Sequence, residues 1–211
     1  MSTAPETVAA IGIPLAWSNW VLPGLGLGVR GRTAANAGFA TAYVVAFRGA
    51  PNWCSAKGFR YGAVSASLVA AGYGVALAIP SVRKRLHELD DRGPEVSSAE
   101  WIAVHIPIGT VYSEEMIFRT TLDPLLDNTF GSRLGSVLGA LTFGLWHIHP
   151  ARAAGDSVPV AIAATAAGGV ALGWLRRRTG SVTAPALLHL AINAGGAIAP
   201  RLARLLGTAR P

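Results

Sequence analysis

The chain has 211 residues, of which 51% are hydrophobic and only 14% are charged, whereas about 25% are charged in an average soluble domain. Apolar runs recur along nearly its whole length, so we predict a single transmembrane domain over residues 1–211 and exclude a pair of soluble domains. The net charge of +7 comes largely from basic residues between these runs. That placement suits lipid headgroups, and we expect no nucleic-acid partner. The single cysteine, Cys54, excludes an intramolecular disulfide and a cysteine-based metal site.

Three apolar runs occupy the first half of the chain, at residues 8–29, 34–47 and 61–82. The first and third are long enough to cross a bilayer, which takes about 20 residues. The middle run is shorter and is either a tilted crossing or an interfacial helix. Gly24 and Gly28 have a spacing that permits close contact between helices. A polar tract that includes Asp90 and Asp91 follows the third run, and we predict that it is the longest soluble connection.

The second half predicts a helix that starts at Ser97, then three spans at residues 132–149, 158–175 and 182–199. Ser97 and Glu100 have the spacing of a capping box, and Pro107 predicts a kink in the helix that follows. Pro124 and the residues up to Gly131 predict a break, and Pro200 is expected to end the last span. The fold class predicted is therefore all-α, a polytopic bundle of six to seven transmembrane helices around an intramembrane polar cavity.

The stretch Ser113–Arg119 places two carboxylates and a guanidinium in this apolar setting. Charges at membrane depth are costly, so such a stretch indicates a working site. In an α-helix, Glu115 and Arg119 stand four residues apart and share a face, where they can form an ion pair. Glu114 lies about 100° away around the helix. We therefore interpret Glu114 as the reactive carboxylate and the other two charges as a supporting pair.

Glu114, His147, His189 and Asn193 are polar groups in apolar helices. A glutamate beside a histidine can hold and deprotonate a water molecule. A second histidine and an amide can donate hydrogen bonds to the oxyanion that forms when this water attacks a carbonyl. His189 and Asn193 are four residues apart and share a helix face, as do Phe143 and His147. The four groups would make a peptide hydrolase without a covalent nucleophile, and we expect them to surround one point.

Three motifs carry a resemblance to a known family: EEMIFR at 114–119 fits EExxxR, FGLWH at 143–147 fits FxxxH, and HLAIN at 189–193 fits HxxxN. In this order they resemble the CPBP family of intramembrane endopeptidases, which includes type II CAAX prenyl proteases and bacteriocin-immunity (Abi-like) proteins. The resemblance covers a catalytic core at about residues 97–200. It implies that Glu114 and His147 activate water and that His189 and Asn193 stabilise the oxyanion. Thr120 departs from the family, in which a glycine often follows the motif arginine.

The resemblance implies a peptide or membrane-anchored protein as substrate, and the Ala-, Gly- and Arg-rich composition is typical of a bacterial cell-membrane protein. This function requires no cofactor. A zinc-dependent membrane hydrolase is an alternative, with Glu114, His147 and His189 as the metal ligands. A proton-coupled transporter is another, because glutamate and histidine at membrane depth also form proton relays. A non-catalytic binding or immunity protein remains a third. Trp146 and Phe143 are interpreted as packing residues.

Overall fold

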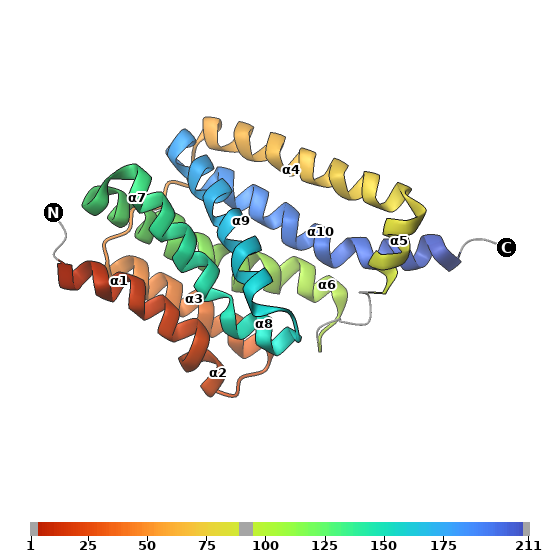
Figure 1. Cartoon of the computed structure of the whole chain (residues 1–211), viewed down its shortest axis with the longest axis horizontal. Coiled ribbons are helices and arrows are strands. Elements are labelled where there is room, and N and C mark those ends of the chain that lie inside the picture. The colour runs from red at the N-terminus through yellow and green to blue at the C-terminus, as the bar shows by residue number, and fades with distance from the viewer. Residues whose placement is uncertain (1–3, 89–94, 209–211) are drawn as a thin grey trace.

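The computed structural model describes residues 4–88 and 95–208, and all regular elements within these residues are helices (Figure 1). The predicted all-α class is therefore confirmed. Asp90 and Asp91, in the predicted polar connection, lie outside the described residues.

The first half of the chain contains α1 (Ala4–Ala16), η1 (Trp17–Val21), α2 (Leu22–Gly24), α3 (Val29–Ala46), α4 (Ala56–Ala78) and α5 (Pro80–His87). The first three follow each other without a break and form one continuous helix, with a π-helical stretch at η1. The predicted close contact at Gly24 and Gly28 is wrong, because neither residue has a neighbour within 4 Å of its added Cβ position. Gly24 ends α2 and Gly28 caps α3, so the two glycines do not share a helix.

The motif segment begins with α6 (Ser98–Glu100) and continues through two π-helices, η3 (Trp101–Tyr112) and η4 (Glu115–Leu122). Ser97 caps its start and accepts a hydrogen bond from the backbone N–H of Glu100, as the capping spacing predicts. Pro107 lies within η3. The hydroxyl of Ser113 donates to the carbonyl of Ile108, five residues back, at 2.9 Å. Wide helical turns therefore occupy the region where the sequence predicted a kink, and π-helical turns are frequent at functional sites.

Helix α7 (Asp123–Trp146) reverses its direction at Gly131, where φ is 78° and ψ is 159°. A Cβ added to Gly135 or Gly139 would collide with Asp127 or Asp123 respectively, so the two halves of α7 run antiparallel and in close contact. The predicted break before Gly131 is confirmed as this reversal, which a glycine allows at low cost.

Three helices complete the fold: α8 (Ile148–Ala154), α9 (Val158–Thr179) and α10 (Thr183–Thr208). Glycines bring α9 against the second half of α7, since Gly169 touches Ala140 and Phe143. Figure 1 shows α10 running beside α4, where a Cβ at Gly195 would collide with Tyr73. The predicted end of the last span at Pro200 is wrong, because α10 continues to Thr208.

Two of the described helices, α4 and α9, are long and apolar enough to cross a membrane, with hydropathies of 1.4 and 1.7. In the most apolar 18-residue stretch of each helix, only 6% of the residues of α4 and 22% of those of α9 are buried inside the protein. Large apolar side chains on other helices are also exposed, including Trp20, Val45 and Leu141. This outer surface suits contact with lipid chains. The total of six to seven crossings stays a prediction.

Candidate active site

Glu114 lies between η3 and η4 and is 6% exposed. The indole N–H of Trp146, at the end of α7, donates to its Oε1 at 3.2 Å. Its other oxygen, Oε2, is buried and has no hydrogen-bond partner. The hydrogen bond to Oε1 thus fixes the orientation of the carboxylate, and Oε2 faces His147 and His189.

The Nε2 atoms of His147 and His189 lie 3.9 Å and 3.8 Å from Oε2 of Glu114. Both distances exceed that of a direct hydrogen bond, which is about 2.7 to 3.2 Å. The three side chains come from η3–η4, α7 and α10. The structure therefore brings three of the four predicted catalytic residues to one point.

Each histidine is held by its other ring nitrogen. Nδ1 of His147 lies 2.7 Å from the carbonyl oxygen of Phe143, and Nδ1 of His189 lies 2.8 Å from Oε1 of Glu115. A carbonyl or an ionised carboxylate can only accept, so Nδ1 carries the proton in both rings. In a neutral ring, Nε2 then presents its lone pair toward Glu114.

His147 lies at the more exposed side of the site. This residue follows the last residue of α7, with φ of −91° and ψ of 8°, and its side chain is 21% exposed. The side chains of Glu114 and His189 are each 8% exposed. Of these three side chains, that of His147 is the most exposed.

Asn193, the fourth predicted residue, lies one turn beyond His189 on α10. Its side-chain amide donates to the backbone carbonyl of His189 at 3.1 Å. An amide nitrogen carries two N–H groups, so this bond uses one donor and leaves the other for a second acceptor. The shared face with His189 agrees with the sequence, and a direct role in catalysis stays a prediction.

Glu115 and Arg119 are fully buried, and Nε of Arg119 lies 3.7 Å from Oε2 of Glu115. A closer partner of Arg119 is Asp123, whose Oδ2 accepts from Nη1 at 3.0 Å. The guanidinium carbon lies 4.8 Å from the ring centre of Phe143, within range of a cation–π contact. The supporting pair is thus a buried chain of three charges. Sequence reasoning missed Asp123, although it stands four residues after Arg119.

Arg119→Ala is expected to lower the free energy of unfolding by about 3 to 5 kcal/mol, because it leaves buried carboxylates without a counter-charge. Thermal unfolding and the yield of folded protein in detergent would measure the effect. Arg178→Gln is the matched control, since that arginine is exposed and should be neutral. Wild-type stability of Arg119→Ala would mean that the three charges do not stabilise one another.

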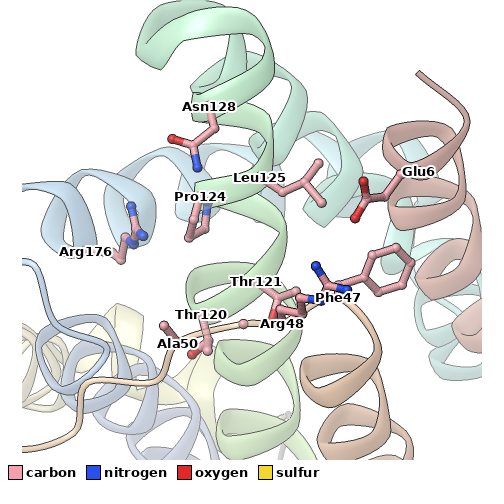
Figure 2. Close-up of a pocket in the computed structure, with 11 residues that line it drawn as sticks. Glu6, Phe47, Arg48, Ala50, Thr120, Thr121, Pro124, Leu125, Asn128 and Arg176 are labelled. Atoms are coloured by element: carbon pink, nitrogen blue, oxygen red, sulfur yellow. The ribbon is translucent and has the colours of Figure 1, made fainter. Parts of the chain in front are cut away.

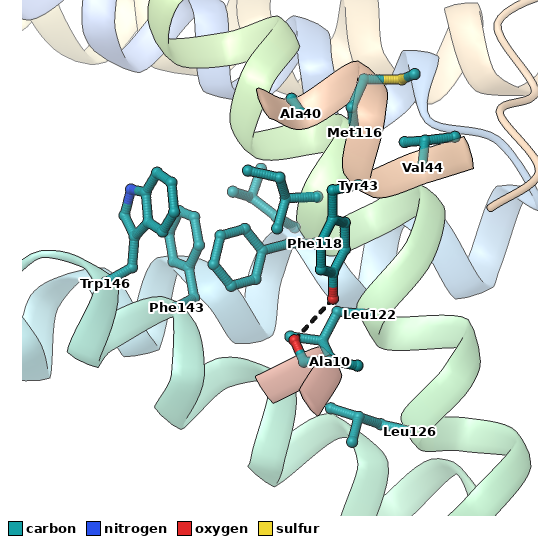
Figure 3. Close-up of a cluster of buried hydrophobic side chains, with 12 residues drawn as sticks. Ala10, Ala40, Tyr43, Val44, Met116, Phe118, Leu122, Leu126, Phe143 and Trp146 are labelled. Carbon is teal, nitrogen blue, oxygen red and sulfur yellow. Dashed lines mark hydrogen bonds between the residues drawn. The ribbon is translucent and has the colours of Figure 1, made fainter. Parts of the chain in front are cut away.

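A cluster of aromatic residues packs beside the site, and Figure 3 shows Phe118, Phe143 and Trp146 within it. Phe118 packs edge-on against Phe143 at 4.9 Å and against Trp146 at 5.6 Å between ring centres. Phe143 in turn lies 4.9 Å from the ring of His147. The predicted packing role of Phe143 and Trp146 is therefore correct but incomplete, because Trp146 also donates to Glu114. The one hint in the sequence of this contact with Glu114 was that Trp146 directly precedes His147.

Within residues 4–88 and 95–208, no group of three or more His, Cys, Asp or Glu side chains is arranged to hold a metal ion. The geometry therefore gives no support to the zinc ligand set of Glu114, His147 and His189.

Residues 97–195 match the family described as type II CAAX prenyl endopeptidase, Rce1-like. This part of the chain is similar to that family. The match includes Glu114, His147, His189 and Asn193, and it begins at the serine that caps the motif segment. The family is membrane-integral, and the similarity suggests a CAAX-type protease, a hydrolase that acts on a membrane-associated peptide or protein. No curated protein and no solved structure matches the chain.

Proposed function

We propose that the chain is an intramembrane endopeptidase in which Glu114 and His147 activate a water molecule and His189 stabilises the oxyanion. The observation that carries the proposal is the buried, unpartnered Oε2 of Glu114 between two Nε2 atoms. A buried polar atom without a partner is costly, so it requires a hydrogen-bonding ligand. Water is the ligand that peptide hydrolysis needs.

The first step is attack of this water on the peptide carbonyl carbon. Oε2 of Glu114 accepts one water proton, and Nε2 of His147 orients the water through its lone pair. The new carbon–oxygen bond forms as the electron pair of the carbonyl moves to its oxygen, which gives a tetrahedral oxyanion. The proton held by Glu114 then passes to the leaving nitrogen as the carbon–nitrogen bond breaks.

His189 stabilises the oxyanion because its ring is paired with Glu115. A carboxylate on Nδ1 favours the protonated imidazolium, as in carboxylate–histidine pairs of other hydrolases. Its Nε2–H would then donate to the oxyanion. The second N–H of Asn193 would add a weaker donor from one turn further along α10.

We also propose that the whole chain is embedded in the membrane. The exposed apolar side chains on helices other than α4 and α9 support six to seven crossings, with the polar residues in an intramembrane cavity. The substrate would then be a peptide segment that enters from the bilayer or its surface.

Cleavage of a fluorogenic peptide by the purified protein in detergent, before and after exhaustive chelation, tests the function. We expect turnover that survives chelation and is lost in Glu114→Gln. Stoichiometric zinc, with activity lost on removal and restored on return, would favour the metal hydrolase. Proton flux into liposomes without cleavage of any peptide would favour the transporter.

A further inference from the structure

A cavity of about 620 Å³ lies apart from the candidate active site (Figure 2). It is lined by the start of α1, the connection between α3 and α4, η4, the first half of α7 and the end of α9. None of Glu114, His147 and His189 lines it. Its volume lies within the usual range of small-molecule sites, about 300 to 1,000 Å³.

The cavity lies near the start of α4 and at the end of α9, the two helices that are long and apolar enough to cross a membrane. Arg176 is in the last turn of α9, and Arg48 lies in the connection that leads into α4. The start of α4 and the end of α9 are adjacent, because the side-chain amide of Asn52 donates to the carbonyl of Gly180 at 2.9 Å. Both arginines are therefore placed at the depth of lipid headgroups, on the same side of the bilayer.

The backbone of Arg48 is strained, with φ of 54°. Arg48 occupies the left-handed position after the end of α3, where glycine is preferred, and the N–H of Gly49 closes the turn on the carbonyl of Val44 at 2.8 Å. The glycine stands one residue later, because a Cβ at position 49 would collide with the hydroxyl of Thr121. Strain of this kind at a cavity wall indicates a ligand-binding role for the side chain.

Arg48 and Arg176 approach the cavity from two sides, and Glu6 is the third charged residue in its lining (Figure 2). Two positive charges and one negative charge leave a net charge of +1. The hydroxyl of Thr120 and the amide of Asn128 add neutral polar groups. Arg176 lies 3.8 Å from Asp127, and the five donors of a guanidinium allow a further partner.

We infer that this cavity binds the phosphate group of a membrane phospholipid, with Arg48 and Arg176 as its two cationic contacts. A phosphodiester carries one negative charge, which matches the net charge of the lining. The planar fork of each guanidinium suits phosphate oxygens. The acyl chains would lie against the exposed apolar surface of the bundle. The site is independent of peptide hydrolysis.

Native mass spectrometry of the full chain in detergent tests this assignment with phosphatidylglycerol, a diacylglycerol that lacks phosphate, and inorganic phosphate. We expect one bound phosphatidylglycerol, with affinity reduced about 10- to 100-fold in Arg48→Gly and in Arg176→Gln. Arg178→Gln, which removes an exposed charge outside the cavity lining, should bind as wild type. Arg48→Gly should also unfold at a higher temperature, because glycine relieves the strain.

Four results would overturn the inference. Unchanged lipid affinity in Arg48→Gly and Arg176→Gln would remove both proposed contacts. An equal loss in Arg178→Gln would assign the binding to general surface charge. Binding of the phosphate-free diacylglycerol with the same affinity, or of inorganic phosphate as tightly as the lipid, would exclude a phospholipid headgroup as the ligand.

Discussion

Glu114→Gln is expected to reduce peptide turnover by about 10²- to 10⁴-fold, the usual contribution of a general base. The substitution keeps the shape of the side chain and an oxygen that can accept from the indole of Trp146. It removes the negative charge at Oε2, which has no hydrogen-bond partner. Initial rates with a fluorogenic peptide, normalised to folded protein, would measure the loss.

The same substitution should leave the unfolding temperature unchanged or raise it, because a buried charge without a hydrogen bond is costly. This separates a chemical role from a structural one. His147→Ala should lose turnover to a similar extent, since it removes the group that orients the water. Full activity of Glu114→Gln would refute the proposed mechanism, whatever its stability.

The positions of the chemical groups were predictable because they are polar residues in apolar helices. Glu114, His147 and His189 follow from this contrast alone, and the structure places them together. The orientation of each group was not predictable, because it depends on tertiary contacts. Trp146 holds Glu114 across a sequence separation of 32 residues, and no local pattern specifies such a bond.

Helical periodicity was a weaker guide near the site. The interpretation of residues 113–119 assumed an α-helix, whereas η3 and η4 are π-helices, whose hydrogen bonds reach one residue further back. The pairing of Glu115 with Arg119 still occurs, at 3.7 Å. The assignment of Glu115 to that pair alone missed its shorter contact with His189, which comes from a helix more than 70 residues later.

The same limit applies to the helix ends. Gly131 marks a reversal that the local composition predicts, since glycine allows its positive φ. Pro200 has an equally strong local signal for a helix end, yet α10 continues. A proline inside a helix removes one backbone hydrogen bond, and here the helix runs on through it for eight residues. A local breaker signal therefore does not decide by itself where a helix ends.

Glu115→Gln is expected to reduce turnover by about 10²- to 10⁴-fold, because an amide can donate to Nδ1 of His189 and stabilise the wrong tautomer. The equivalent change in a Ser-His-Asp triad costs about 10⁴-fold. Glu115 also lies beside Arg119, so the variant will lose stability as well. Turnover per folded molecule must therefore be compared with a variant that disturbs only the buried charges.

Asp123→Asn is that matched control. It weakens the 3.0 Å contact with Arg119 and does not touch His189. We expect both variants to unfold at lower temperature, while only Glu115→Gln loses turnover per folded molecule. In addition, Glu115→Gln should cause little further loss in a His189→Ala background, because the two residues act as one unit. Equal losses of turnover in Glu115→Gln and Asp123→Asn would make Glu115 a structural counter-ion and leave His189 without a positioning partner.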